Sequence, residues 1–311
     1  MITTKTQILP NFLIVGAGKS GTTSLYYYLK DHPDIFFSPI KEPCFFSAQI
    51  LKLPQAGTGD ERKYFANTFD NYLELFKDAR DEKAIGEASA DTLYYYNETI
   101  PMIHKYLGDP KIIIILRNPV DRAFSAYLHL LRENRETLSF EEGLKKEEER
   151  IKNNWCCMWH YTKRGMYFNQ VDAFMKSFSN VKVVLYDDFK RDSRHEIRSI
   201  CKFLEVDTAY IPPHDKTHFN VSGIPRYGKI NNLFVKKNIF QKTIRTVGSF
   251  LLTEDGWVRL RENLRARIMT KPRMKTETRL YLQDMFREDI LKLQQLTEMD
   301  LSVWLGQDNS N

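Results

Sequence analysis

The stretch from Asn11 to Phe46 constrains the fold of this chain more than any other part of the sequence. It opens with the apolar run Phe12–Val15, continues through the small-residue segment GAGKSGTT, and enters the helix-forming stretch Ser24–Lys30. A short unbroken apolar run is typical of a buried strand, and a glycine-rich turn after it lets the chain reverse into a helix. The segment therefore predicts a strand, a tight loop and a helix.

The loop in this segment has the composition of an anion site. Glycines let backbone N–H groups approach an anion closely, and the N-terminus of the following helix adds a partial positive charge. Lys19 supplies a full charge, and the hydroxyl residues that follow supply donors. The nucleotide-triphosphate pattern G-x-x-x-x-G-K-[ST] would need a glycine five residues before Gly18, where this chain has Leu13. The loop is therefore shorter than that of the nucleotide triphosphatases.

Strand-like and helix-like stretches alternate along the chain. The strand-like runs are Phe12–Val15, Asp34–Phe37, Ala84–Glu87, Lys111–Leu116 and Val181–Tyr186. Alternation of this kind predicts an α/β fold with one central parallel sheet flanked by helices. Ligands of such sheets bind beyond the carboxyl ends of the strands, where we expect Glu42, Glu87 and Arg117 to gather.

The chain is long enough for one large domain. It has 311 residues, of which 42% are hydrophobic, so we expect a single domain over 1–311 with tails at 1–10 and 306–311. Helices are expected at 121–132, 165–178, 194–204, 233–269 and 276–305. The charged stretch Glu133–Asn154 is interpreted as a helical, solvated surface. The four cysteines have no metal-ligand spacing and are interpreted as reduced thiols of a cytoplasmic protein.

A second motif follows the most continuous strand-like run. Arg117 stands at its end, and Ser125 stands on the second turn of the predicted next helix, within RNPVDRAFS. Both side chains can reach one anion there, with the arginine binding it through two N–H groups. Taken alone, the pair fits equally well an arginine bound to a carboxylate and a serine within a helix.

Together the two motifs resemble those of the sulfotransferase family that uses 3'-phosphoadenosine 5'-phosphosulfate (PAPS). The resemblance implies a P-loop-like sulfotransferase fold, with the loop holding the 5'-phosphosulfate and Arg117 and Ser125 holding the 3'-phosphate. It also implies that Lys19 stabilises the transferred group, and that no metal takes part, because a sulfonate carries less charge than a phosphate. The PAPS-binding residues are then Gly18, Lys19, Ser20, Gly21, Thr22, Thr23, Ser24, Arg117, Ser125 and, through a basic late loop, Arg226.

The catalytic base implied by this resemblance is Glu42. The segment KEPCFF is similar to the K-E-x-x-F-F segment of heparan sulfate and related bacterial sulfotransferases, in which the glutamate is the base. Cys44 replaces a histidine that the family often has, and Ala88 replaces a lysine, which weakens the inference of a heavily sulfated acceptor. His129, one turn beyond Ser125, is the alternative base. Trp155 and Trp159 lie in a segment that we expect to line an acceptor pocket.

The predicted function is transfer of a sulfuryl group from PAPS to a hydroxyl, or as second choice an amine, of a carbohydrate or small natural product. A P-loop small-molecule kinase is one alternative. The other is a nucleic-acid or polyanion-binding protein, because residues 226–279 hold fourteen Lys or Arg against four acidic residues. We expect a small-molecule or carbohydrate acceptor as partner, and neither nucleic acid nor membrane. No apolar stretch approaches the roughly 20 residues of a membrane span.

Overall fold

The computed structural model describes residues 8–61, 66–210, 224–225, 269–270 and 272–306. Arg226, nearly all of the predicted helix 233–269 and most of the basic segment 226–279 lie outside these residues.

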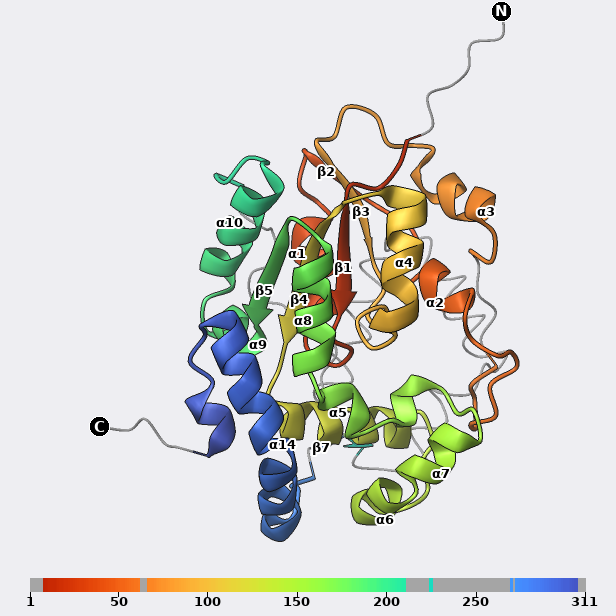
Figure 1. Cartoon of the computed structure of the whole chain (residues 1–311), viewed down its shortest axis with the longest axis vertical. Coiled ribbons are helices and arrows are strands. Elements are labelled where there is room, and N and C mark those ends of the chain that lie inside the picture. The colour runs from red at the N-terminus through yellow and green to blue at the C-terminus, as the bar shows by residue number, and fades with distance from the viewer. Residues whose placement is uncertain (1–7, 62–65, 211–223, 226–268, 271, 307–311) are drawn as a thin grey trace, which may run out of the picture.

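Five parallel strands form the central sheet, as the sequence predicts (Figure 1). In chain order they are β1 (Phe12–Gly16), β2 (Ile35–Phe37), β3 (Ala84–Ala88), β4 (Lys111–Leu116) and β5 (Val181–Leu185). Their order across the sheet is β2-β3-β1-β4-β5, so β1 lies at the centre between β3 and β4. The loop that follows β1 therefore starts from the middle of the carboxyl edge, where the strand order reverses and ligands bind in folds of this class.

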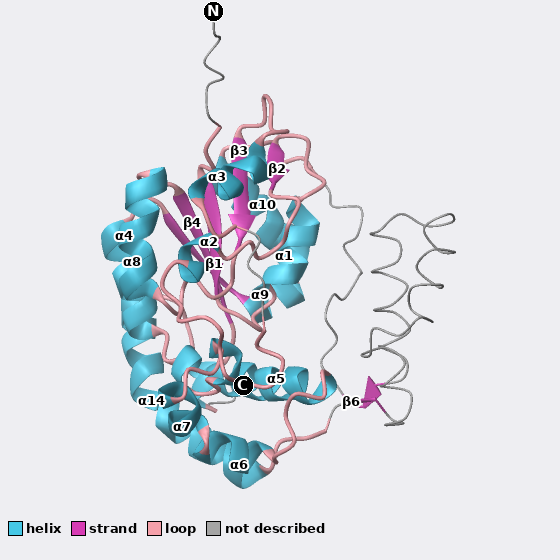
Figure 2. Cartoon of the chain, turned by 90° about the vertical axis from the view of Figure 1, so that its right-hand side faces the viewer, coloured by secondary structure: helices cyan, strands magenta, loops and turns pink. Residues whose placement is uncertain are grey.

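Helices cover both faces of the sheet (Figure 2). Helices α4 (Tyr96–Leu107) and α8 (Phe168–Ser177) lie on one face, and α1 (Thr22–Leu29) and α10 (Ser193–Leu204) lie on the other. Successive side chains of a strand point to opposite faces. Accordingly, Leu13 and Val15 of β1 belong to one hydrophobic cluster, and Phe12 and Ile14 belong to the other. Both faces are dry, which explains the unbroken apolar runs of β1 and β4.

Helix α5 (Pro119–Arg132) crosses the carboxyl edge of the sheet (Figure 1). The Asn118 side chain accepts a hydrogen bond from the Val120 N–H at 3.0 Å, and Pro119 fills the first helical position, where no N–H is needed. The chain therefore turns sharply from β4 into α5, which carries the second motif over the ends of the strands. Helix α14 (Thr276–Thr297) joins α5 through an ion pair of 2.7 Å between Arg279 and Asp121.

The remaining elements are short. They are α2 (Phe45–Ala48), α3 (Phe69–Leu73), η1 (Glu74–Phe76), α6 (Phe140–Lys145), α7 (Glu147–Lys152), η2 (Cys157–Trp159), η3 (Lys163–Gly165), α9 (Tyr186–Arg191), η4 (Ser302–Leu305) and the strand pair β6 (Ile224–Pro225) and β7 (Met269–Thr270). The helix α4 was not expected, because Pro101 lies inside it.

The interpretation of residues 133–154 as a solvated surface holds only in part, because Lys145, Lys146 and Glu149 are exposed whereas other charged residues are not. Glu136 and Arg150 are buried, and their two-point ion pair has N–O distances of 2.8 and 3.1 Å. The Tyr161 hydroxyl donates to the same carboxylate at 2.7 Å, and the Arg150 guanidinium lies 4.6 Å from the centre of the Trp159 ring. Charges are buried here because each is paired and hydrogen-bonded, and composition alone does not reveal such pairing.

Candidate active site

The loop between β1 and α1 adopts a conformation that depends on its glycines. Gly21 has φ 99° at the start of α1, a region that other residues rarely adopt, and a Cβ there would lie 2.7 Å from the Tyr186 ring. Gly18 packs directly against the guanidinium of Arg164, where a Cβ has no room. The Ala17 N–H donates to the Ile115 carbonyl at 2.8 Å, which ties the loop to β4. The loop is therefore held from several sides in one shape.

A cavity of about 930 Å³ opens beside this loop. Nine of the predicted site residues line it: Gly18, Lys19, Gly21, Thr22, Thr23, Ser24, Glu42, Arg117 and Ser125. Ser20 does not line the cavity, because it is fully buried beneath the loop. The two motifs, about a hundred residues apart in the sequence, thus share one cavity at the carboxyl edge of the sheet.

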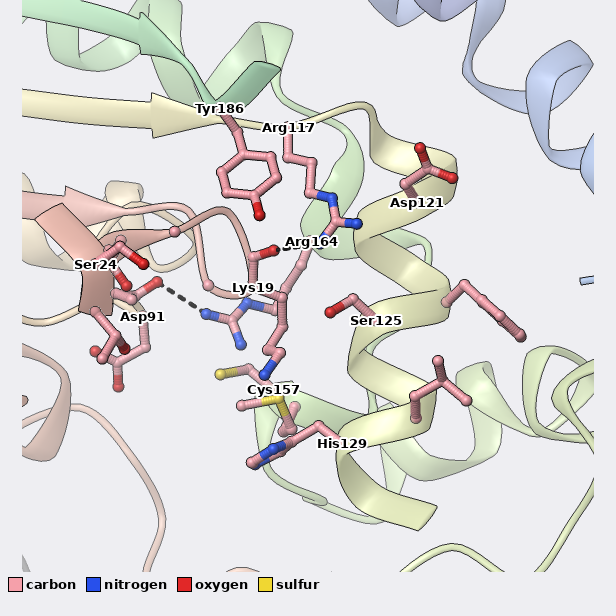
Figure 3. A pocket seen from close by; sticks show the side chains of 18 of the residues that line it. Lys19, Ser24, Asp91, Arg117, Asp121, Ser125, His129, Cys157, Arg164 and Tyr186 are labelled. Atoms are coloured by element: carbon pink, nitrogen blue, oxygen red, sulfur yellow. Dashed lines mark hydrogen bonds between the residues drawn. The ribbon is translucent and has the colours of Figure 1, made fainter. Parts of the chain in front are cut away.

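Lys19 reaches toward the end of the cavity where Cys157 and His129 lie (Figure 3). The pKa of this ammonium group is lowered to about 7: burial is the largest cause, the cations Arg132 and Arg117 contribute, and the Glu42 carboxylate acts in the opposite direction. An ammonium group with so little negative charge near it favours an anionic ligand, since a bound anion would restore its full positive charge.

Arg117 and Ser125 stand on the opposite wall. An N–H of the Arg117 guanidinium donates to the Lys19 carbonyl at 3.3 Å, and the guanidinium lies 5.0 Å from the centre of the Tyr186 ring. Ser125 is buried on α5 and faces into the cavity (Figure 3). The arginine is therefore fixed against the phosphate loop, at a position from which it and Ser125 can bind one anionic group.

Glu42 enters the cavity from the loop after β2. Its carboxylate forms an ion pair with Lys41, with an N–O distance of 2.9 Å, and its side chain is 32% exposed. The Glu42 N–H donates to the Ala88 carbonyl at 3.0 Å, so the loop is fastened to the end of β3. A partly exposed carboxylate on a fixed loop, facing a lysine, can accept a proton from a bound hydroxyl.

The family model described as "Sulfotransferase family" matches residues 10–210, which contain both motifs and all five strands. The chain belongs to the PAPS-dependent sulfotransferase family. A sulfotransferase from Alicyclobacillus acidocaldarius has a crystal structure that matches with a TM-score of 0.75 and 36% identity, over 96% of this chain and 99% of that one. The predicted family and fold are thus confirmed.

Two curated sulfotransferases from Mus musculus are more distant. Carbohydrate sulfotransferase 15 is 29% identical over 197 residues, which are 52% of this chain and 34% of that protein. Heparan sulfate glucosamine 3-O-sulfotransferase 6 is 24% identical over 227 residues, which are 70% of this chain and 58% of that protein. The chain therefore matches only part of the length of these curated relatives.

The histidines of this sulfotransferase differ in their surroundings. His129 lines the cavity, and its Nδ1 lies 2.8 Å from a guanidinium nitrogen of Arg132. A guanidinium can only donate, so Nδ1 accepts and the proton of a neutral His129 is on Nε2. His32, His104 and His160 lie outside the cavity wall and bond the carbonyls of Asp207, Gly108 and Trp155, respectively. In this arrangement the Nε2–H of a neutral His129 is a hydrogen-bond donor.

Sequence reasoning underestimated the segment Arg164–Tyr167. Besides packing against Gly18, Arg164 lines the cavity and donates to the Ala90 carbonyl at 2.8 Å. The Tyr167 hydroxyl donates to the Arg117 carbonyl at 3.0 Å. One segment therefore supports the phosphate loop and the second motif together. The pattern RGMY, similar to the family's Gly-x-Tyr, was the available signal, although packing explains that pattern equally well.

The segment that holds Trp155 and Trp159 lines the cavity, but the two tryptophan rings do not. Their rings pack against each other, with centroids 4.7 Å apart, and neither contributes to the cavity wall. The residues between them line the cavity instead, together with three more distant side chains: Cys156, Cys157, Met158, Leu51, Gln55 and Tyr95. This end of the cavity is therefore mainly apolar.

Glu87 also lies outside the cavity wall, contrary to the expectation that it joins the cleft. It is buried, and burial raises the pKa of its carboxyl to about 8, with the carboxylates of Asp91 and Glu42 adding to the effect. The Ser89 hydroxyl donates to it at 2.7 Å. A pKa near 8 favours the protonated form of Glu87 at neutral pH.

Within the described part of the chain, no three His, Cys, Asp or Glu side chains gather as metal ligands would. Nor does any helix among the residues described have the length and apolar character needed to cross a bilayer.

Proposed function

We propose that this protein transfers the sulfuryl group of PAPS to a hydroxyl of a carbohydrate or small natural product and releases adenosine 3',5'-bisphosphate. The observation that supports this most strongly is the single cavity that Lys19, Arg117, Ser125 and Glu42 line together. These residues come from three separate segments, and each has the chemistry that one part of the reaction needs.

The nucleotide would lie along the phosphate loop. Backbone N–H groups of the loop and the N-terminus of α1, with the hydroxyls of Thr22, Thr23 and Ser24, would bind the 5'-phosphosulfate. Arg117 and Ser125 would bind the 3'-phosphate, which distinguishes PAPS from other adenine nucleotides. Arg226 keeps its predicted role in a late basic loop, outside the described residues.

The reaction forms one S–O bond and breaks another. The acceptor hydroxyl attacks sulfur while Glu42 takes its proton, and the bond between sulfur and the bridging phosphate oxygen breaks. Negative charge grows on that oxygen, where the Lys19 ammonium would stabilise it. The Nε2–H of His129 would donate to a sulfonate or acceptor oxygen. No metal is required in this scheme.

The acceptor class rests on the cavity wall and on the names of the relatives. The apolar side chains Leu51, Tyr95 and Met158 suit an uncharged acceptor with an apolar face, such as a sugar ring or a natural product. The two mouse relatives act, by their names, on carbohydrates. A hydroxyl is therefore proposed first and an amine second.

Calorimetric titration without metal tests this function. We expect adenosine 3',5'-bisphosphate to bind with micromolar affinity and ATP with Mg²⁺ to bind far more weakly. Tight binding of ATP with Mg²⁺ alone would overturn the proposal in favour of a kinase. A panel of 4-nitrophenyl glycosides with sulfur-labelled PAPS then tests the acceptor class, with 4-nitrophenol and an aminosugar as non-carbohydrate and amine controls.

A further inference from the structure

The loop that carries the proposed base has an unusual backbone. Glu42 has φ 57° and Cys44 has φ 54°, on either side of Pro43. Residues other than glycine rarely adopt this left-handed region, and they stay there only when their surroundings hold them. Something outside the loop must therefore fix the direction in which the Glu42 side chain points.

The residues at the end of β3 provide that support. The Glu42 N–H donates to the Ala88 carbonyl at 3.0 Å, and the Cys44 N–H donates to the Ser89 Oγ at 2.9 Å. The Ser89 hydroxyl in turn donates to Oε2 of Glu87 at 2.7 Å. Ser89 is buried, so these bonds form away from water. The two left-handed residues are thus each anchored through their own N–H group.

Ser89 is also bonded to the strand that leads into the phosphate loop. Its backbone N–H donates to the Ile14 carbonyl at 3.1 Å, and the Leu93 N–H donates to the Val15 carbonyl at 2.8 Å. The main chain of Ser89 is therefore fixed to β1, while its side chain is fixed to the Glu42 loop. One buried residue links the segment that ends in Lys19 to the segment that carries Glu42.

We propose that Ser89 is a positioning residue that sets the place of the Glu42 carboxylate relative to Lys19, with Glu87 as the acceptor that orients its hydroxyl. This rests on the proposed function for the identity of the base, but the mechanical link is a property of the folded chain. The serine hydroxyl both accepts and donates, and alanine at this position would do neither.

Hydrogen exchange measured by mass spectrometry tests the mechanical link without any substrate. In Ser89→Ala, peptides covering residues 40–48 should exchange about tenfold faster, because two neighbouring anchors loosen. Peptides covering residues 12–24 should exchange as in the wild type. Thr278→Val is the matched control: it removes another buried hydroxyl, which donates to Glu141 at 2.7 Å far along the chain, and should leave both regions unchanged.

Kinetics test the link to catalysis. With water as acceptor, the release of labelled sulfate from PAPS should fall in Ser89→Ala by roughly 10-fold to 10²-fold, the scale of a small misplacement of a catalytic group. The affinity for adenosine 3',5'-bisphosphate should stay within about twofold, as expected for a residue that does not touch the nucleotide. In the Glu42→Gln background the same substitution should cause no further loss, because two residues acting through one function are not additive.

Wild-type exchange in residues 40–48 of Ser89→Ala would overturn the proposal, as would rate losses that multiply in the double variant. Failure of the wild type to bind the bisphosphate would instead remove the proposed function, and the exchange experiment would still decide whether Ser89 holds the loop.

Discussion

The two ends of the cavity are built in different ways. The nucleotide end consists of Gly18, Lys19, Gly21–Ser24, Arg117 and Ser125, which lie in the segments that follow two adjacent central strands. The acceptor end consists of Leu51, Gln55, Tyr95 and residues 156–158, which come from separate loops. Local sequence determines the nucleotide end, because a strand and the turn after it directly place these residues. Contacts between distant loops determine the acceptor end.

Those distant contacts are specific. The Cys156 N–H donates to the Asp60 carboxylate at 2.8 Å, and the Ala56 N–H donates to the Asn154 carbonyl at 3.1 Å. Arg135 forms an ion pair with the same Asp60 carboxylate. The segments around residues 56 and 156 thus fix each other, and neither has a pattern that identifies its partner. We therefore expect the sequence to predict the nucleotide end better than the acceptor end. We also expect single substitutions at the nucleotide end to have the larger effects on activity.

The largest effect is expected for Lys19→Ala. Removal of the charge that stabilises the departing oxygen should lower the transfer rate about 10²-fold to 10³-fold and weaken bisphosphate binding. The measurement is release of labelled sulfate together with calorimetric titration. Lys105→Ala, on the exposed side of α4, is the control for a lost surface charge. Near-normal turnover in Lys19→Ala would exclude this lysine from the mechanism.

Glu42→Gln tests the proposed base, at the place where the nucleotide end of the cavity meets the acceptor end. The rate should fall about 10²-fold, the usual contribution of a general base, while bisphosphate affinity stays within about twofold. His129→Gln, which retains an N–H donor, should lose less than about tenfold if His129 only donates. The opposite ranking of these two variants would make His129 the base.

Ser125→Ala should affect only the recognition of the 3'-phosphate. A lost hydrogen bond to a charged group corresponds to roughly a tenfold or larger rise in the dissociation constant of adenosine 3',5'-bisphosphate. The affinity for AMP, which lacks that phosphate, should not change. Comparable weakening for both nucleotides would place Ser125 elsewhere in the site and blur the division between the two ends.

Nucleotide binding should take up a proton at Lys19. In the protein without nucleotide, the pKa of Lys19 is about 7, and a bound anion raises it. At pH 8 a mostly neutral Lys19 must therefore become charged when the nucleotide binds. Affinity should therefore fall as pH rises above about 7. Calorimetry at pH 8 in buffers of different ionisation enthalpy should show an uptake close to one proton, and Lys19→Met should abolish it. The ligand phosphates, whose second pKa is about 6, are already ionised there.

The last prediction concerns stability rather than activity, at the buried Glu87. Its pKa of about 8 in the folded protein lies above the 4.5 of an ordinary glutamic acid side chain, so the folded state binds the extra proton. The free energy of unfolding should fall as pH rises between these values, by up to about 1.4 kcal/mol per pH unit. Denaturant titrations of Glu87→Gln should show a weaker decline between pH 6 and 8. Equal slopes in both proteins would mean that Glu87 is already ionised when folded.

The fold could be predicted from the sequence because burial on both faces leaves a local signal. The runs Phe12–Val15 and Ile112–Leu116 are apolar in every position, so their strands agree with the structure within a few residues. Helix α4 was not predicted, because Pro101 inside it argues against a helix, although tertiary packing keeps it. The ion pair between Glu136 and Arg150 was likewise not predicted, because it depends on how the folded chain brings the two side chains together.

The candidate site divides in the same way. Lys19, Arg117 and Ser125 could be found because each stands at a fixed offset from a strand. Arg164 carries a weaker signal, since its contact with Gly18 joins segments far apart in the chain. At the acceptor end the segment around Trp155 and Trp159 was correctly indicated, but the two rings pack against each other outside the cavity wall, because large aromatic side chains fill cores as readily as pockets.

Helix α14 supports the nucleotide end from the far end of the described chain. Its Asp289 accepts the backbone N–H of Tyr167 at 2.7 Å, and Tyr167 donates to the Arg117 carbonyl. On the ribosome all five strands emerge before α14 does. A nascent chain can therefore assemble its sheet early, but the support that Asp289 gives to Arg117 through Tyr167 forms only after residue 289 has been translated.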